Sequence, residues 1–183
     1  MRRILAALWL LLLALVGPVD AQLYPNGYYA LYMSTPNVSI TGAGALTETS
    51  MASVRIPANT IGPDGTVRIY TLWSMNNNAN NKTVNTRYGL VPGAINGTQG
   101  GQFQQQLFPN VASVQGLIIV RNTGATNSQQ ILNSMTGPYN TSTVINTQTV
   151  DTTQDTYFSI NGTLANAGDT LTLNKYIVEV YHQ

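Results

Sequence analysis

A short run of alternating residues near the centre of the chain constrains the fold most. Residues 66–74, TVRIYTLWS, are rich in β-branched and aromatic side chains, which is typical of a strand that is buried on at least one face. Successive side chains of a strand point to opposite faces of its sheet. We therefore expect one face to carry Val67, Ile69, Thr71 and Trp73, and the other to carry Arg68, Tyr70, Leu72 and Ser74.

Turn signals flank this strand on both sides. Residues 62–65, GPDG, combine a proline of fixed φ, an aspartate and two glycines that can adopt positive φ, so they predict a tight turn. After the strand, the apolar pattern stops at the Asn-rich residues 76–81 and resumes as an alternating pattern over 82–88. We interpret the asparagines of this strand–turn–strand unit as turn residues rather than ligand groups, because asparagine bonds nearby backbone.

Further strands are expected along the rest of the chain. They cover residues 53–57, 113–122, 143–150, 156–164 and 170–181, whereas residues 90–106 are interpreted as a loop. The strand at 113–122 is continuously apolar at its centre, so we expect it to be covered on both faces. In the last strand the apolar phase changes, which predicts a β-bulge near Asn174 and Lys175. About seven or eight short strands predict an all-β fold, an antiparallel β-sandwich of jelly-roll type.

The N-terminal segment has the pattern of a secretory signal. Arg2 and Arg3 precede an apolar run from Ile4 to Val16, and a small-x-small ending predicts cleavage after Ala21. One alternative is an uncleaved anchor, although about thirteen apolar residues fall short of the roughly twenty that cross a bilayer. Another is an apolar tail used in assembly inside a virion. The predicted parts are a signal peptide at 1–21, an N-terminal arm or linker at 22–52, and a β-sandwich domain at 53–183.

Charge and residue usage argue against several classes of function. Only 8% of the residues are charged, and without residues 1–21 the chain has six basic and six acidic residues. Nucleic-acid binding rests on clustered lysine and arginine, so nucleic acid is not an expected partner. The chain has no cysteine and a single histidine, His182, which leaves little material for a Ser-His-Asp triad or a zinc site.

The acidic residues give weak signals for chemistry. Asp151, Asp155 and Asp169 could gather at loop ends as oxygen ligands for Ca²⁺, but they lack the spacing of a known calcium loop, so we interpret them as solvated turn residues. Glu48 and Glu179 are isolated in the pattern, whereas glycoside hydrolysis needs two carboxylates that flank a cleft. We therefore expect no enzyme activity, no catalytic residue, no metal and no cofactor.

Two groups of residues are candidates for ligand binding. The first is an aromatic cluster whose rings offer an apolar face and a polar tip to a sugar: Tyr24, Tyr28, Tyr29 and Tyr32. The second lies at the end of the long loop and contains Gln102 and Gln104. The alternative for the tyrosines is an edge strand or arm laid on its own domain or on a neighbouring subunit, and for the loop it is a solvated excursion.

Several motifs of the chain resemble a module of tailed-bacteriophage virion and tail-fibre proteins. They are IPANTIGPDGTVRIYTLWS, NNNANNKTVNTRYG, IIVRNTGATNSQ and TLANAGDTLTLNKYIVEVY, which together extend over most of residues 54–181. The resemblance implies one β-sandwich that serves as a virion structural or host-attachment module, usually homotrimeric. The predicted signal segment departs from that family, so a host-encoded, exported relative is an alternative.

The leading hypothesis is a non-enzymatic, phage-like virion structural or host-attachment module, of the fibre or decoration kind. Its expected partners are itself, as a homo-oligomer and most simply a trimer, and other virion proteins or a cell-surface glycan. The expected location is the virion or, after export, the periplasm or the extracellular space. The alternative hypothesis is a secreted carbohydrate-binding module of bacterial or prophage origin that uses the tyrosine cluster and the loop over 93–106.

Overall fold

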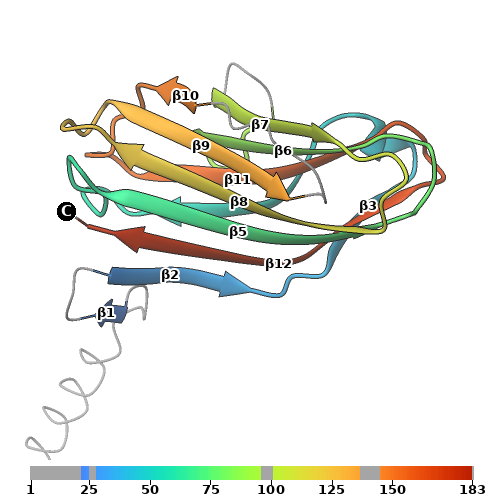
Figure 1. Ribbon diagram of the computed structural model, residues 1–183, viewed down its shortest axis with the longest axis horizontal. Helices are drawn as coiled ribbons and strands as arrows, with labels where there is room; N and C mark the ends of the chain where they lie inside the picture. The colour runs from blue at the N-terminus through green and yellow to red at the C-terminus, as the bar shows by residue number, and fades with distance from the viewer. Residues whose placement is uncertain (1–21, 25–27, 96–100, 137–144, 183) are drawn as a thin grey trace, which may run out of the picture.

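The computed structural model describes residues 22–24, 28–95, 101–136 and 145–182, so the predicted signal segment lies outside the described residues. The described residues form β-strands and one short 3-10 helix (Figure 1). In chain order the elements are β1 (Gln22–Tyr24), β2 (Tyr28–Ser34), β3 (Val38–Thr41), η1 (Ala43–Leu46), β4 (Thr49–Ile56), β5 (Thr66–Met75), β6 (Lys82–Gly89), β7 (Gly101–Leu107), β8 (Ser113–Asn122), β9 (Gln129–Thr136), β10 (Ile145–Gln148), β11 (Thr156–Leu164) and β12 (Thr170–Tyr181).

The strands form two antiparallel sheets that pack face to face. The larger sheet has eight strands in the order β1-β2-β12-β5-β8-β9-β10, with β3 also paired to β12. The smaller sheet has four strands in the order β4-β11-β6-β7. Between the two layers, β3 contacts β4, β11 contacts β12, and β7 contacts β9. The expectation of an all-β antiparallel sandwich is confirmed.

The central strand predicted from the sequence is β5, and its faces are as expected. Val67, Ile69, Thr71 and Trp73 are buried, whereas Tyr70 and Leu72 on the opposite face are exposed. Trp73 lies fully in the core, as its position in the alternating pattern predicts. The core also contains Tyr88 of β6 and Phe158 of β11, whose rings stack with centroids 4.5 Å apart.

The turn before β5 is confirmed, but the reason for one of its glycines is different. The Gly65 amide donates to the Gly62 carbonyl oxygen at 3.0 Å, which closes the turn. Neither glycine is among the described residues with positive φ. Instead, a Cβ atom on Gly65 would lie 2.9 Å from both the Gly62 nitrogen and the Tyr181 carbonyl oxygen. Glycine is therefore required here by close backbone approach rather than by its freedom in φ.

The unit around the Asn-rich segment is not a hairpin within one sheet. Strand β5 lies between β12 and β8 in the larger sheet, whereas β6 lies between β11 and β7 in the smaller one. Residues 76–81 therefore carry the chain from one layer to the other. The alternating pattern expected for 82–88 is also wrong as a guide to exposure, because every residue of β6 is buried. A central strand becomes buried on both faces when loops cover its outer side.

Three further expectations change. The outer face of β8 is not covered, since Gln115 is exposed and Leu117 is only half-buried. The second half of the loop expected over 90–106 contains β7, which forms the edge of the smaller sheet. The arm or linker expected over 22–52 contributes β1, β2 and β3 to the larger sheet and the first half of β4 to the smaller one.

The last strand, β12, has the irregularity that its sequence predicts. Its register against β5 shifts between Leu173 and Lys175, so the β-bulge near Asn174 is confirmed. Below the bulge Leu171 and Leu173 face the core, and above it Tyr176, Val178 and Val180 do so. The bulge keeps both apolar sets on the same side and leaves Lys175, Ile177 and Glu179 on the outer face of the larger sheet.

Candidate functional site

The outer face of the larger sheet carries an apolar row across four neighbouring strands. In the register of the sheet, Met33 of β2 pairs with Ile177 of β12, Ile177 pairs with Tyr70 of β5, and Tyr70 pairs with Leu117 of β8. The Met33 side chain is 70% exposed and Tyr70 is 36% exposed. Large apolar side chains aligned on an open sheet face are a common feature of interaction surfaces.

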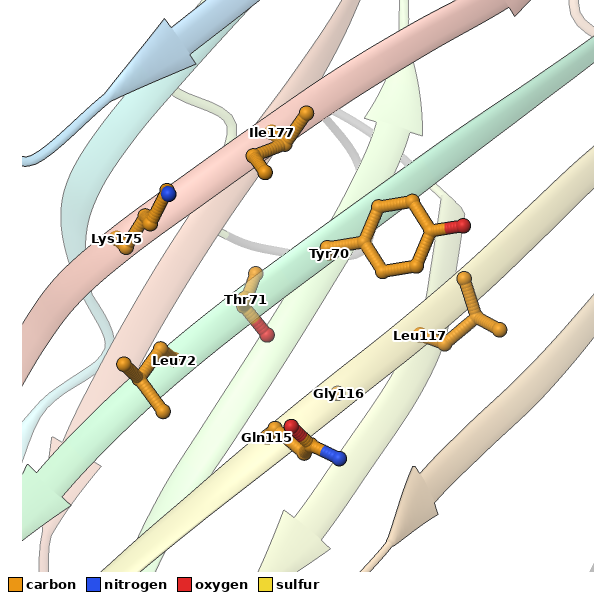
Figure 2. A pocket seen from close by; sticks show the side chains of 8 residues that line it. All are labelled: Tyr70, Thr71, Leu72, Gln115, Gly116, Leu117, Lys175 and Ile177. Atoms are coloured by element: carbon orange, nitrogen blue, oxygen red, sulfur yellow. The ribbon is translucent and has the colours of Figure 1, made fainter.

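A second row lies beside the first, one step along the strands. It consists of Lys175 on β12, Leu72 on β5 and Gln115 on β8, which are paired in register. Leu72 is 43% exposed. Apart from Met33, the residues of the two rows line a groove of about 450 Å³, which Thr71 and Gly116 complete. Figure 2 shows the lining side chains on three neighbouring strands, with no bulky side chain at Gly116. We refer to the two rows as the open face.

A charged group of residues borders the open face on the side away from Lys175, Leu72 and Gln115. The Arg68 guanidinium lies over the Tyr181 ring, with its Cζ 4.8 Å from the ring centroid, and its Nη1 donates to the Tyr181 hydroxyl at 3.3 Å. The Tyr181 hydroxyl in turn donates to the Glu179 carboxylate at 3.4 Å. Burial raises the pKa of Tyr181, and the neighbouring Glu179 carboxylate raises it further. These contacts fix the polar edge of the face.

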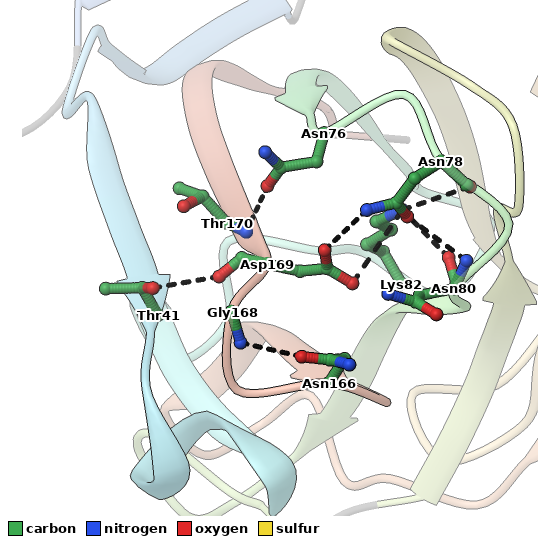
Figure 3. A network of polar contacts seen from close by, with 9 residues as sticks. All are labelled: Thr41, Asn76, Asn78, Asn80, Lys82, Asn166, Gly168, Asp169 and Thr170. Atoms are coloured by element: carbon green, nitrogen blue, oxygen red, sulfur yellow. Dashed lines mark hydrogen bonds and ion pairs between the residues drawn. The ribbon is translucent and has the colours of Figure 1, made fainter.

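A buried polar network joins the Asn-rich segment to the turn before β12. The Asn78 amide donates to Asp169 Oδ1 at 2.6 Å, and Lys82 Nζ lies 4.0 Å from Asp169 Oδ2 (Figure 3). Lys82 Nζ also donates to the side-chain oxygen of Asn78 and, at 2.8 Å, to the Asn80 carbonyl oxygen. The hydrogen bond from Asn78 is the main reason that the pKa of Asp169 lies below its ordinary value. Because Lys82 is fully buried, this network ties the two layers together rather than presenting groups to a ligand.

A second polar cluster covers the outer side of the smaller sheet. Arg87 of β6 binds both oxygens of Glu48, with Nε at 2.8 Å from Oε1 and Nη2 at 2.6 Å from Oε2. Asn161 of β11 donates to the same Glu48 Oε1 at 2.7 Å and to the Ala94 carbonyl oxygen at 2.7 Å. The carboxylate thus anchors the segment before β4 to the sheet. Glu48 and Glu179 lie on different sheets and do not flank a common cleft.

The three aspartates considered as calcium ligands take part in separate interactions. Asp151 accepts hydrogen bonds from the Thr153 hydroxyl and backbone amide, which lower the pKa of Asp151. Asp155 forms an ion pair with Arg55 at 2.8 Å. Asp169 belongs to the buried network around Lys82. Within the described ranges, no three acidic or histidine side chains gather where they could hold a metal ion. No helix in the same part of the chain has the length and apolar character needed to cross a membrane.

The backbone places the ligand-binding candidates at two separate edges. Tyr24 belongs to β1, and Tyr28, Tyr29 and Tyr32 belong to β2, at one end of the larger sheet. Gln102 and Gln104 belong to β7, the edge strand of the smaller sheet that contacts β9 near the other end of the larger one. The side chains of all six lie outside the described residues, so their role in binding stays a prediction.

Sequence reasoning did not single out the open face. The pattern of β5 identifies Tyr70 and Leu72 as outward residues, and the bulge assigns Ile177 to the same side. The missing information is strand pairing, since only the order β12-β5-β8 makes these residues neighbours. The expectation that β8 is covered on both faces concealed the contribution of Leu117.

Comparison with known proteins gives structural matches alone. No protein-family model matches the chain, and no curated protein sequence matches it significantly. Among solved structures, the Lotus tetragonolobus seed lectin aligns with a TM-score of 0.40 and 9% identity over 88% of this chain and 90% of the lectin. The CBM2 module of an evolved Dit from Lactobacillus casei BL23 phage J-1 aligns with a TM-score of 0.40 and 14% identity, over 89% and 79%. Lectin I from Ulex europaeus, in complex with the methyl glycoside of α-L-fucose, has a TM-score of 0.37 and 9% identity over 88% and 89%.

The architecture is defined by the strand pairing of the chain itself. The chain is a two-layered, all-β sandwich that is structurally like lectins and a phage CBM2 module, at low sequence identity. At TM-scores of 0.37 to 0.40 these matches carry no argument about function, which rests on the chain's own surface.

Proposed function

We propose that this protein is a non-enzymatic attachment and assembly module whose working surface is the open face of the larger sheet. The observation that carries the proposal is the apolar row Met33, Ile177, Tyr70 and Leu117, which runs in register across four strands. Exposed apolar side chains cost free energy in water, about 25 cal/mol for each Å² left uncovered. A contact that covers this row recovers that free energy, which favours association through this face.

The chemistry of the row supports a protein surface as the main partner more strongly than a sugar. A sugar site combines an aromatic platform with several converging hydrogen-bonding groups. On the open face, Tyr70 is accompanied mainly by aliphatic side chains, while Gln115 and Lys175 lie at the outer positions of the second row. Aliphatic side chains cannot satisfy sugar hydroxyls but pack well against other apolar side chains.

The particular assignment follows from the sequence motifs. Their resemblance to phage virion and tail-fibre modules supports a virion structural or host-attachment role, a jelly-roll form of the sandwich and self-assembly into a homo-oligomer. The resemblance implies a trimer. The predicted signal at 1–21 supports export to the periplasm or the extracellular space as the alternative to a place in the virion. Mass spectrometry of the mature protein tests export, since a chain that still begins at Met1 argues against cleavage.

A matched pair of variants tests the proposed surface. Leu72 on the open face is 43% exposed and Leu90, which follows β6 of the smaller sheet, is 44% exposed, so Leu72→Glu and Leu90→Glu place the same charge at equally exposed sites. We expect the wild-type chain to self-associate at micromolar concentration in light scattering, Leu72→Glu to weaken association about tenfold or more, and Leu90→Glu to leave it unchanged. Equal behaviour of the two variants, or a wild-type monomer, would contradict the proposal.

Carbohydrate binding is the second candidate, and one observation favours it. The groove of about 450 Å³ is in the size range of small-molecule sites and has the Gln115 amide on its wall. A glycan array of the wild-type chain and of Gln115→Ala tests this candidate. We expect a binder lost in the variant if the groove holds a sugar, and no signal at high protein concentration argues against it.

A further inference from the structure

We propose that the open face docks onto the same face of a second copy of this chain, related by a two-fold axis that lies between the faces and runs across the strands. This inference rests on the proposed function and specifies its partner. It follows from the order of outward residues on β12, β5 and β8. A symmetric contact of this kind requires that the face be complementary to itself.

The charges on β12 meet that requirement. Lys175, Ile177 and Glu179 point outward at intervals of two residues, and the residues that follow each of them, Tyr176, Val178 and Val180, are buried. A two-fold axis that crosses the strands at Ile177 reverses the direction of β12 in the second copy. Each Lys175 then lies opposite Glu179 of the partner subunit, so a pair of opposite charges forms on both sides of the axis.

The neighbouring strands fit the same operation. On β5, Arg68 and Leu72 lie on either side of Tyr70, so Arg68 faces Leu72 of the partner subunit. The aliphatic part of an arginine covers apolar surface while its guanidinium stays in contact with water. On β8 the exchange is between Gln115 and Ile119, on either side of Leu117. No position on these strands meets a residue of like charge.

The other simple symmetry is less favourable. A level of the face is the set of residues that pair with one another across the strands. An axis parallel to the strands would place each level opposite the same level of the second copy. The level of Arg68 and Glu179 would bring these opposite charges together, but the level of Lys175 would meet itself. Lysine ammonium groups would then be crowded together without a carboxylate at their level, and like charges close together across an interface weaken it.

The size of the face is compatible with a stable contact. Four strands spaced about 4.8 Å apart, each with about ten residues at about 3.3 Å, span about 600 Å². A typical protein interface buries about 800 Å² of accessible surface on each partner, and accessible area exceeds the flat area because side chains project from the sheet. A face-to-face contact over β2, β12, β5 and β8 therefore reaches the normal range.

Charge exchange at Lys175 and Glu179 tests the geometry with the full chain. In Lys175→Glu, two glutamates face each other on both sides of the axis, and in Glu179→Lys, two lysines do so. We expect each variant alone to self-associate about tenfold or more weakly than the wild type in sedimentation equilibrium. An equimolar mixture of the two variants restores opposite charges at every position, so it should form heterodimers about as well as the wild type forms dimers. The double variant Lys175→Glu/Glu179→Lys should also dimerise, and does not depend on either single variant being well folded.

The outcomes separate this inference from the proposed function. A mixture that associates no better than its components, or a double variant that stays monomeric, overturns the two-fold arrangement. The two-fold arrangement is also overturned if the wild type is a trimer that dissociates in Leu72→Glu but does not respond to the charge exchange. That result would still leave the open face as the working surface. Equal behaviour of Leu72→Glu and Leu90→Glu instead removes the proposed function itself.

Discussion

Replacing the buried lysine of β6 should remove a large part of the stability of the sandwich. Lys82 is fully buried, yet its Nζ is close to four oxygen groups: the Asn78 side chain, the Asn80 carbonyl at 2.8 Å, the Asn78 carbonyl at 3.4 Å and, more distantly, Asp169 at 4.0 Å. Lys82→Met keeps the length and the apolar stem of the side chain but removes its charge and its donors. The variant therefore isolates the contribution of the ammonium group.

The expected loss can be estimated from the hydrogen bonds. Hydrogen bonds to a charged group contribute about 1.5 to 3 kcal/mol each, and Lys82 makes two close ones, to the Asn78 side chain and to the Asn80 carbonyl. The bond to the Asn78 carbonyl is long, at 3.4 Å, and adds little. Relief from the desolvation of the ammonium offsets part of the loss. We expect Lys82→Met to lower the free energy of unfolding by about 3 to 5 kcal/mol, a large share of the roughly 5 to 15 kcal/mol of a typical domain.

Urea unfolding followed by tryptophan fluorescence is a suitable assay, because Trp73 is fully buried and its emission should shift on unfolding. With a slope of about 2 kcal/mol per molar urea, the midpoint should fall by about 2 M. Arg121→Met is the control. Because Arg121 is exposed at the end of β8, this substitution should change the free energy of unfolding by less than about 0.5 kcal/mol. If Lys82→Met lowers the free energy of unfolding by less than about 1 kcal/mol, the reasoning is refuted, because the hydrogen bonds would then only offset the desolvation of the ammonium group.

Two further predictions concern the core and acid stability. Gly162→Ala should destabilise the chain by about 1 to 3 kcal/mol through overpacking, because the new Cβ would lie 2.8 Å from the Ile40 Cδ1. Thermal unfolding checks this against Gly44→Ala, whose Cβ meets nothing within 4 Å. Asp169 has a lowered pKa in the folded chain, mainly through the Asn78 amide, so its stabilisation is present above the ordinary aspartate pKa and is lost as the pH falls through the folded value. The stability of Asp169→Asn should therefore fall less steeply than that of wild type below about pH 4, and equal slopes in acid would exclude this role.

The strands themselves were largely predictable, because their signal is local. The bounds of β8 and β12 agree with the expected ranges 113–122 and 170–181, and the bulge near Asn174 follows from a change of apolar phase. Strand β7 was missed because a Gln-rich segment after several glycines resembles a loop, and its membership in a sheet depends on pairing with β6. Polar side chains are acceptable at an edge, where packing demands little.

The candidate site was predictable only in pieces. Alternation shows that Tyr70 and Leu72 point away from Trp73, but it does not show what lies beside them. The pattern placed Lys82 at the start of the alternating segment 82–88 and gave no sign of its burial, since lysine is rarely buried without partners. Its burial follows from the position of Asp169, which is far away in the sequence. The two residues are adjacent because β11 pairs with β6, with Leu164 opposite Lys82, and the turn after β11 contains Asp169.

The sequence by itself determined the all-β character of this protein, the inward phase of its central strand and the place of its last bulge. These properties depend on a two-residue period and on turn residues, which act over a few positions of the chain. The tertiary structure alone decided that β5 lies between β12 and β8, that the Asn-rich segment crosses between layers, and that four outward apolar side chains form one row. Strand pairing joins residues about a hundred positions apart, and no local period records which strand becomes the neighbour of which.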